Sequence, residues 1–362
     1  MSLPNNRKVL VFDFNIVYPI LSGYSLLNQV LSDSQSEYVL VFNFKSQLYE
    51  ILSEQGYKCY IVPYGTRRGV NKIFDYITVL FKALLIAKKE SPTLVHANNA
   101  LAGRLAIPLA KILNVPSLVQ IRNTGLPPRT SLILKYATRV LAVSNFVKNS
   151  LPYEMKLKTD VVYDGQPFSS NAFSKIKESS RIVIGMSCRM SEQKGVDLFL
   201  KLEKALSDLG YIDKVDFIHC GGQPDTSIIS SDMLSKSKVK WLGYIDDMNN
   251  FWSKVDIGLL TSNDDEAFGR VIIEGVSNGV TFVSSRCGGP EEIIIDKKTG
   301  FLFDINSIKQ LTDIVIKLID DGSYRKSISL KAFYDMQKKF SNEAYVLNII
   351  NSYKKVDKIA SL

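Results

Sequence analysis

The chain has 362 residues, which is enough for two domains of ordinary size. Hydrophobic residues make up 46% and charged residues 22%, proportions that exclude a disordered or fibrous protein. The most apolar window, residues 73–87, contains Asp75 and Lys82 and is shorter than the ~20 uncharged residues that a membrane-spanning helix needs. The N-terminus shows no apolar signal segment, so a cytoplasmic location is expected. Four scattered cysteines and two histidines predict neither disulfides nor a zinc site.

Charge is divided unevenly along the chain. Residues 1–170 hold 19 Lys and Arg against 10 Asp and Glu, whereas residues 171–362 hold 26 of each, so the net charge of +9 lies in the first half. This imbalance predicts that the first half meets something anionic, such as a lipid surface, a nucleic acid or a phosphorylated substrate. A solvated basic face is the alternative.

Short β-rich runs alternate with helical patterns in the first half of the chain. The runs are residues 9–12, 38–42, 59–62, 93–97, 117–121 and 139–143. Strands separated by helices in this way predict a parallel, doubly wound sheet. The stretch 164–180 lacks periodicity and is rich in Ser, Gly, Pro and Lys, which is typical of a linker.

One helical run of the first half, within residues 67–89, has basic residues before, along and after it. The apolar residues on one of its faces are Ile73, Phe74, Ile77, Leu80, Phe81 and Leu84. This face can pack on the sheet or lie on a bilayer, and packing is expected because the helix connects two strands. Its basic residues, including Arg67, Arg68, Lys88 and Lys89, predict weak, salt-sensitive binding to anionic membranes.

The alternation of strands and helices starts again after the linker. The β-rich runs are residues 181–187, 215–220, 239–243, 256–262, 280–285 and 300–303. The sequence therefore predicts two Rossmann-like α/β domains around a cleft. Ligands of such domains bind beyond the carboxyl ends of the strands, so the loops that follow these runs are the candidate site segments.

The first candidate segment carries two cations around a turn. Arg189 and Lys194 follow the strand 181–187 and precede a helical run from residue 196 to 209. A helix N-terminus offers free N–H groups and a positive dipole end, so two cations there suit a diphosphate. Ordinary loop charges are the alternative for this spacing when it is taken alone.

The second candidate segment, residues 266–274, carries two carboxylates. Phe268 and Gly269 are expected to begin a helix, which leaves Glu266 in the loop and Glu274 about one and a half turns into the helix. Carboxylates suit sugar hydroxyls, and the N–H groups of Phe268 and Gly269 supply donors nearby. A capping acid and a surface acid are the alternative.

A third candidate loop, residues 286–292, contains the adjacent glycines Gly288 and Gly289. Two glycines allow the backbone to approach a ligand closely. A Gly-Gly-Pro turn without a ligand is equally consistent with the loop taken alone.

The order of these motifs resembles a known family. R-x4-K-G, then E-x7-E, then G-G-P-E-E and T-G-F-L-F are similar to the donor domain of the retaining glycosyltransferases of family 4, which have the GT-B fold of two facing Rossmann-like domains. The resemblance covers residues ~138–355. It implies an acceptor-side domain over residues 1–165, completed by a C-terminal helix at 341–362, and a donor-binding domain over residues 166–340.

The resemblance implies a role for each motif residue. Arg189 and Lys194 would hold the diphosphate of a nucleotide sugar. Glu266 would contact the donor sugar beside the N–H groups of Phe268 and Gly269, and Glu274 would bind the ribose. In the same way, the segment containing Gly243 matches the part that borders the base in relatives.

The first domain departs from the family pattern. Relatives often carry a Gly-Gly pair after the first strand, where this chain has the single Gly23. Relatives often carry a histidine where this chain has Arg122 followed by Asn123, and an arginine cannot act as a neutral acid or base. His96 is a further candidate at a strand end, although lone histidines are more often packed, and His219 is expected in the core.

The resemblance therefore predicts a retaining glycosyltransferase that moves a sugar from a nucleotide sugar to a saccharide or lipid-linked saccharide, in bacterial surface polysaccharide synthesis. The partners expected are the donor and the acceptor, with peripheral contact to the inner face of an anionic membrane and with no nucleic acid. Neither a cofactor nor a metal is expected, and residues 264–266 are the one place where a divalent ion could bind. The alternatives are a GT-B-fold epimerase, which would convert the sugar nucleotide without an acceptor, and a non-catalytic sugar-nucleotide-binding subunit.

Overall fold

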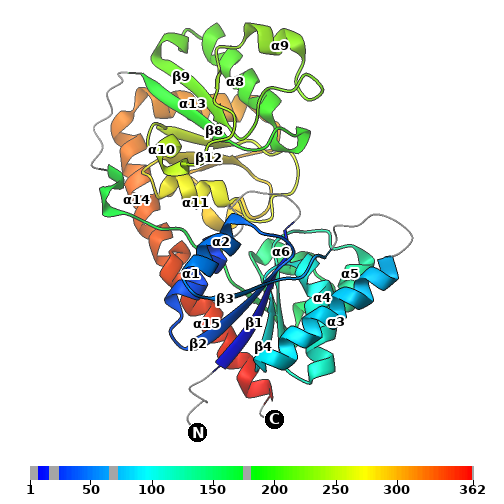
Figure 1. Ribbon diagram of the computed structural model, residues 1–362. Helices are drawn as coiled ribbons and strands as arrows, with labels where there is room; N and C mark the ends of the chain where they lie inside the picture. Colours follow the sequence, from blue (N-terminus) through cyan, green and yellow to red (C-terminus); the bar gives the residue numbers. More distant parts are fainter. Residues whose placement is uncertain (1–6, 16–23, 65–71, 174–180, 361–362) are drawn as a thin grey trace. The chain divides into compact units, whose positions relative to one another are not determined.

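The computed structural model describes residues 7–15, 24–64, 72–173 and 181–360. The chain forms two compact units (Figure 1). Unit 1 comprises Met1–Gly165 together with Asn342–Leu362, and unit 2 comprises Gln166–Ser341. Unit 2 is thus inserted into unit 1, because the chain returns to unit 1 with its last helix.

Unit 1 contains a parallel sheet in the order β3-β2-β1-β4-β5-β6-β7. Its described strands are β1 (Arg7–Asp13), β2 (Ser36–Phe42), β3 (Lys58–Ile61), β4 (Leu94–Ala97), β5 (Ser117–Ile121), β6 (Arg139–Ala142) and β7 (Thr159–Val161). Val11 of β1 lies opposite Leu40 on one side and His96 on the other. The order reverses between β1 and β4, which is the place where doubly wound sheets bind ligands.

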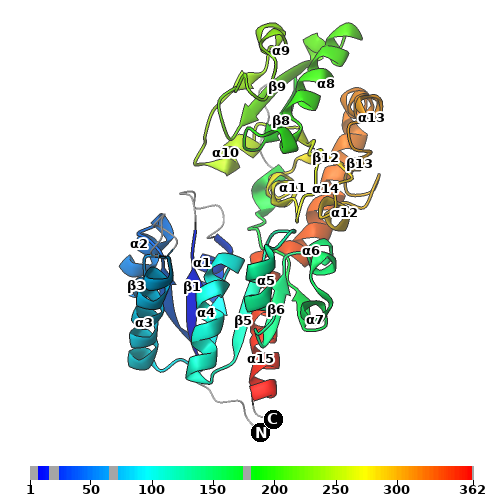
Figure 2. The same ribbon diagram turned by 90° about the vertical axis from the view of Figure 1, so that its right-hand side faces the viewer.

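Helices cover both faces of this sheet (Figures 1 and 2). The described helices are α1 (Tyr24–Ser32), α2 (Gln47–Glu54), α3 (Lys72–Glu90), α4 (Ala100–Leu113), α5 (Pro128–Leu134), α6 (Asn145–Ser150), α7 (Tyr153–Lys156) and α15 (Asn342–Ala360). The apolar run of β1 is fully buried because both faces of the sheet are covered. Tyr345, Ile349 and Tyr353 of α15 belong to the core on one face, so the last helix is part of unit 1.

Unit 2 contains a second parallel sheet, in the order β10-β9-β8-β11-β12-β13. Its described strands are β8 (Ile182–Ser187), β9 (Val215–Cys220), β10 (Lys240–Trp241), β11 (Ile257–Leu260), β12 (Thr281–Ser285) and β13 (Phe301–Phe303). Its described helices are α8 (Val196–Asp208), α9 (Ser231–Lys236), α10 (Met248–Trp252), α11 (Arg270–Val276), α12 (Pro290–Ile293), α13 (Ile308–Asp320) and α14 (Gly322–Phe340). Both sheets confirm the predicted fold class of two Rossmann-like domains.

The predicted linker is more ordered than expected over its described part, residues 164–173. Gln166 pairs with Ser341 in a short parallel bridge. The rings of Phe168 and Phe173 both pack edge-on against Phe333 of α14, with centroids 5.3 and 5.2 Å apart. Aromatic packing therefore joins this stretch to unit 2. Residues 174–180 lie outside the described residues.

Helix α3 differs from its predicted packing. Its buried apolar residues are Val79, Ala83 and Ala87, whereas Phe74 and Phe81 of the predicted packing face are more than half exposed. The prediction that the large apolar face packs on the sheet is wrong, because the smaller residues of the helix occupy that position. No helix among the described residues is long and apolar enough to cross a bilayer.

Candidate functional site

The loop after β8 carries both predicted cations, and the second of them lies at the start of α8. Lys194 ends a short 3-10 helix, Glu192–Lys194, and Gly195 then caps α8 with φ of +63°. A Cβ at position 195 would lie 2.0 Å from the carbonyl oxygen of Thr261, so only glycine fits. Arg189 is exposed and forms no hydrogen bond or ion pair with the described residues.

Two residues after β11 hold this loop in place. The Thr261 hydroxyl donates a hydrogen bond to the carbonyl oxygen of Gly195, at 2.9 Å. Asn263 donates its backbone N–H to the Gln193 carbonyl and its side-chain amide to the Glu192 carbonyl, both at 3.0 Å. Sequence reasoning missed Thr261 and Asn263. Their place directly after an apolar strand is the signal that could have found them.

Lys194 and Glu266 form an ion pair, with Nζ and Oε2 2.5 Å apart. Their side chains are 27% and 19% exposed, so the pair is accessible to a ligand. Ser262 also donates its hydroxyl to Oε2 of Glu266, at 3.3 Å. The structure thus brings together a residue predicted to bind the diphosphate and the residue predicted to bind the donor sugar. A cation and a carboxylate this close can bind an anionic group and a hydroxyl of one molecule.

The loops containing Glu266 and Gly289 are bonded to each other. Glu266 donates its N–H to the Cys287 carbonyl, and its own carbonyl accepts from the N–H of Gly289, both at 2.8 Å. A Cβ at Gly289 would lie 2.4 Å from Cα of Phe268. Backbone atoms of Phe268 therefore occupy the space beside Gly289 where a ligand was expected. This glycine instead allows the two loops to pack closely. Gly288, with φ of +96°, occupies the turn beside it.

Helix α11 begins one residue later than Phe268 and Gly269 suggested. Gly269 precedes it with φ of +92°, and the Phe268 side chain is buried against Phe340. Only the backbone of Phe268 could therefore meet a ligand. Glu274 lies just over one turn into α11 and accepts a hydrogen bond from Arg270, at 2.9 Å, with both side chains mostly buried. A ribose at Glu274 would share this carboxylate with Arg270.

The loop after β10 meets the loop after β9 at the same edge of the sheet. The carbonyl of Gly243, whose φ is +68°, accepts the N–H of Gly221 at 2.7 Å. A Cβ at Gly221 would lie 2.2 Å from the Cys188 carbonyl oxygen, which places the loop after β9 against the residue preceding Arg189. Tyr244 is 82% exposed beside Gly243. This edge of unit 2 therefore combines loops from three neighbouring strands.

The predicted residues of unit 1 have different surroundings. Arg122 forms an ion pair with Asp164 and donates to Gln120 Oε1 at 3.1 Å, so much of its guanidinium is already used within unit 1. Asn123 is exposed. Gly23 lies outside the described residues.

His96 is a core residue, which corrects its prediction as a ligand contact. The side chain is fully buried, and its Nδ1 lies 2.8 Å from the hydroxyl of Tyr353. Burial lowers the pKa of His96 to about 3, so the ring stays neutral. His219 of unit 2 is also buried, as predicted, and burial lowers its pKa to about 4.

Asp13 is a candidate that sequence reasoning missed. It ends β1 and is buried, and it accepts hydrogen bonds from the side-chain amides of Asn98 and Asn15, each at 2.9 Å. Burial raises the pKa of this carboxyl, although the two amides lower it. The signal that could have identified Asp13 is its place directly after the apolar run 9–12.

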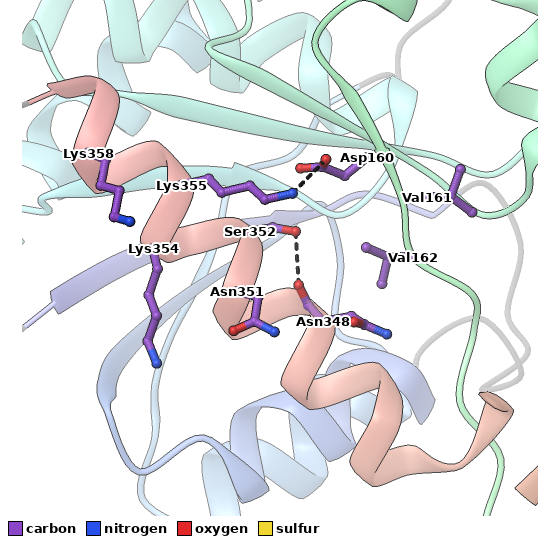
Figure 3. Close-up of a pocket in the computed structure, with 9 residues that line it drawn as sticks. All are labelled: Asp160, Val161, Val162, Asn348, Asn351, Ser352, Lys354, Lys355 and Lys358. Carbon is purple, nitrogen blue, oxygen red and sulfur yellow. Dashed lines mark hydrogen bonds and ion pairs between the residues drawn. The ribbon is translucent and has the colours of Figure 1, made fainter. Parts of the chain in front are cut away.

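A surface pocket of about 470 Å³ lies elsewhere in unit 1 (Figure 3). It is formed between β7 and α15. Its lining residues are Asp160, Val161, Val162, Asn348, Asn351, Ser352, Lys354, Lys355 and Lys358. Lys355 forms an ion pair with Asp160 at 2.9 Å, as the dashed line in Figure 3 shows. None of the predicted site residues lines this pocket.

Metal ions in proteins are held by clusters of His, Cys, Asp or Glu side chains. No group of three or more His, Cys, Asp or Glu residues among the described positions could hold a metal ion. In the segment 264–266, Asp264 accepts the N–H of Asp265 and Glu266 is paired with Lys194. The expectation of metal independence stays a prediction.

The architecture defines the class of protein. A crystal structure of Anabaena HepE in complex with UDP and glucose matches with a TM-score of 0.80, covering 96% of this chain and 100% of that chain at 17% identity. This likeness establishes the GT-B fold of two Rossmann-like domains.

Sequence comparisons then give the class of enzyme. Residues 168–334 match the model of the glycosyl transferases group 1. An uncharacterized glycosyltransferase of Methanocaldococcus jannaschii is 24% identical over 356 residues, covering 94% of this chain and 97% of the relative. The UDP-Gal:alpha-D-GlcNAc-diphosphoundecaprenol alpha-1,3-galactosyltransferase of Escherichia coli is 24% identical over 378 residues, covering 95% and 94%. Residues 168–334 are thus similar to the glycosyl transferases group 1, and the chain is a glycosyltransferase.

Proposed function

We propose that this protein is a retaining glycosyltransferase of family 4 that transfers a sugar from a uridine diphosphate sugar to a hydroxyl of a lipid-linked saccharide. The observation that carries the proposal is the accessible Lys194–Glu266 pair at the start of α8, with the exposed Arg189 on the same loop. Two cations suit a diphosphate, and the carboxylate suits a sugar hydroxyl attached to it.

The names of similar proteins support the choice of donor and acceptor. HepE was crystallised with UDP and glucose, and the E. coli relative uses UDP-Gal and a diphosphoundecaprenol-linked sugar. We extend both features to this chain. The corresponding process is the assembly of a surface polysaccharide, and the place of work is the inner face of the cytoplasmic membrane.

The proposed reaction breaks the bond between the anomeric carbon and the diphosphate oxygen. Negative charge then builds on the leaving oxygen, where Lys194 and Arg189 would stabilise it together with the N–H groups of the adjoining turn. A single preorganised donor of this kind contributes ~3 to 4 kcal/mol in comparable sites. Fixed cations thus supply the charge stabilisation that a metal ion supplies elsewhere.

Retention follows if the acceptor attacks the face from which the diphosphate leaves. The acceptor oxygen forms the new bond to the anomeric carbon, and its proton passes to the departing diphosphate. In retaining glycosidases the alternative is a carboxylate nucleophile, with the two carboxyl groups ~5 Å apart. The carboxylate of Glu266 is instead assigned to the donor sugar, because it is paired with the cation that would hold the diphosphate.

The test begins with a thermal-shift screen of UDP-, GDP- and ADP-sugars, since a ligand that binds the folded state raises the melting temperature. Hits are then incubated with and without a diphosphoundecaprenol-linked saccharide, and the anomeric configuration of the product is determined by NMR. Transfer with retention only in the presence of acceptor is expected. Conversion of the sugar nucleotide alone would establish the epimerase alternative, and binding without turnover would establish a non-catalytic subunit.

A further inference from the structure

Helix α3 carries two apolar stripes on opposite sides. Each residue advances 100° around a helix, so Val79, Ala83 and Ala87 share one side, and they are 7%, 0% and 1% exposed. The opposite side carries a second stripe, defined here as Phe74, Ile77, Phe81 and Leu85. Its members are 74%, 56%, 58% and 52% exposed.

The exposed stripe is continuous and large. Phe74 to Leu85 spans about 16 Å along the helix axis at ~1.5 Å per residue. Four large apolar side chains in one row, two of them aromatic, exceed the scattered apolar residues that are normal on a protein surface. Such a row indicates a surface that meets an apolar partner.

Lysines border the exposed stripe. Lys82 and Lys89 lie on one flank of the row by helical spacing, Lys88 lies at its C-terminal end, and all three residues are exposed. Lys89 also lies over the Tyr60 ring, with Nζ 5.6 Å from the centroid. Basic residues beside an apolar row are the pattern of helices that lie in the interface of an anionic bilayer.

The charge of the whole unit favours the same partner. Unit 1 holds 22 Lys and Arg against 12 Asp and Glu, a net charge of +10, whereas unit 2 holds 23 against 24, a net charge of −1. An anionic lipid surface would attract unit 1 electrostatically but would not attract unit 2. A neutral protein partner would not account for this separation.

We propose that the exposed stripe of α3 inserts into the interfacial region of an anionic membrane, with Lys82, Lys88 and Lys89 at the level of the lipid headgroups. The inference rests on the proposed function, since it brings unit 1 to the surface that carries a lipid-linked acceptor. It differs from adhesion by charge alone, because buried apolar area keeps part of the affinity at high salt.

The experiment compares the wild-type protein with two double variants. Phe74→Ser with Phe81→Ser removes the aromatic part of the stripe. Leu157→Ser with Leu347→Ser is the matched control, because these residues are also exposed on unit 1 but lie directly after α7 and in α15, respectively. Equal melting temperatures show that each variant is folded.

Co-sedimentation is measured with vesicles of phosphatidylglycerol and phosphatidylcholine, and with phosphatidylcholine alone, at low salt and at 1 M NaCl. We expect the wild-type protein and the control to bind anionic vesicles and to keep a measurable part of that binding at high salt. The Phe74→Ser, Phe81→Ser protein should lose at least about tenfold in affinity. A Phe81→Trp protein should show a blue-shifted emission on vesicle binding. Equal binding by all variants, or a loss of all wild-type binding at 1 M NaCl, would overturn the insertion.

Two further readouts separate this proposal from its alternatives. Transfer to a water-soluble acceptor should be unchanged in the Phe74→Ser, Phe81→Ser protein, because the stripe holds no predicted site residue. If vesicles do not bind but transfer occurs, the insertion is wrong and the proposed function stands. If vesicles bind but no sugar is transferred with any donor, the proposed function is wrong. A wild-type dimer that the double variant converts to a monomer would assign the stripe to a second copy of the chain.

Discussion

Lys194 and Glu266 neutralise one another in the absence of a donor. A diphosphate that binds Lys194 must therefore share this cation with the Glu266 carboxylate. A sugar hydroxyl, in contrast, donates a further hydrogen bond to the same carboxylate. The two side chains consequently have separable contributions, one toward the nucleotide part of the ligand and one toward its sugar.

Substitutions should separate the two contributions. Lys194→Ala is expected to weaken UDP binding and to lower kcat/KM for transfer by about 10²- to 10³-fold, because a charge-stabilising donor is lost. Glu266→Gln should lower transfer strongly but leave UDP binding equal or tighter, because Lys194 is no longer paired. Calorimetric titration with UDP beside transfer rates checks both. Lys201→Ala, which removes an exposed lysine of α8, is the control and should match the wild-type protein. Equal losses of UDP binding in both site variants would contradict the assignment of Lys194 to the nucleotide and Glu266 to the sugar.

The buried histidines predict how stability depends on pH. His96 has a pKa of about 3 in the folded protein against an ordinary value of 6.5, so the unfolded chain binds the additional proton between these values. Its contribution to stability is therefore complete above pH 6.5 and is lost as the pH falls toward 3. At pH 5 the loss is about 2 kcal/mol, and His219 acts in the same direction.

Denaturant unfolding at pH 7 and pH 5 tests this dependence. His96→Gln should lose less stability than the wild-type protein between the two pH values, because its side chain does not titrate. His219→Gln offers the same comparison in unit 2. An identical pH response in wild type and both variants would show that other groups dominate.

At the level of elements, the loop before α8 depends on the strand end beside it. Asn263→Ala removes the side-chain hydrogen bond to the Glu192 carbonyl while leaving the backbone bond to Gln193. The expected result is a rise in KM for the donor of about tenfold with a smaller change in kcat, because Lys194 is held less firmly. Steady-state kinetics with varied donor concentration measure the two constants. Asn249→Ala on α10 is the control, and equal kinetics of the two variants would remove Asn263 from a positioning role.

Sequence periodicity predicted the alternation of strands and helices well, because buried parallel strands are short, continuous apolar runs. It could not decide which apolar side of α3 packs. Hydrophobicity alone favours Phe74 and Phe81 for the core, whereas close contact with neighbouring elements favours Val79, Ala83 and Ala87.

The site was predictable to a different extent. The order of the motifs identified Lys194 and Glu266 as candidate site residues, and the structure pairs their side chains. Spacing along the sequence could not show that the backbone of Phe268 occupies the space beside Gly289, or that His96 packs against Tyr353. Both depend on contacts between distant segments, which a local pattern does not contain.

At the level of the whole molecule, unit 1 is assembled from both ends of the chain. Arg7 of β1 pairs with Asp357 of α15, and Tyr353 is buried beside β1 and β4 residues. Unit 2, in contrast, is one continuous segment, Gln166–Ser341, with a core of its own.

Removal of α15 should therefore affect the two units unequally. A chain ending at Ser341 loses Tyr345, Ile349 and Tyr353 from the core of unit 1, and each large core side chain contributes several kcal/mol. We expect calorimetry to show that the unfolding transition of unit 1 disappears while that of unit 2 remains. UDP should still raise the melting temperature of unit 2 if the donor binds there. Loss of both transitions would mean that unit 2 depends on unit 1 for its stability.

The return of α15 to unit 1 also sets an order of events during synthesis on the ribosome. The first 165 residues emerge early, but the helix that covers one face of their sheet is made last, after the 176 residues of unit 2. At ~5 to 20 residues per second, the nascent first unit waits about 10 to 40 s with the α15 portion of that face uncovered, beside the portion that α1 and α2 cover. Unit 2 can fold during this interval. The segment made first is therefore the one that completes its fold last, and its exposed sheet face is the part of the newborn chain that a chaperone would need to protect.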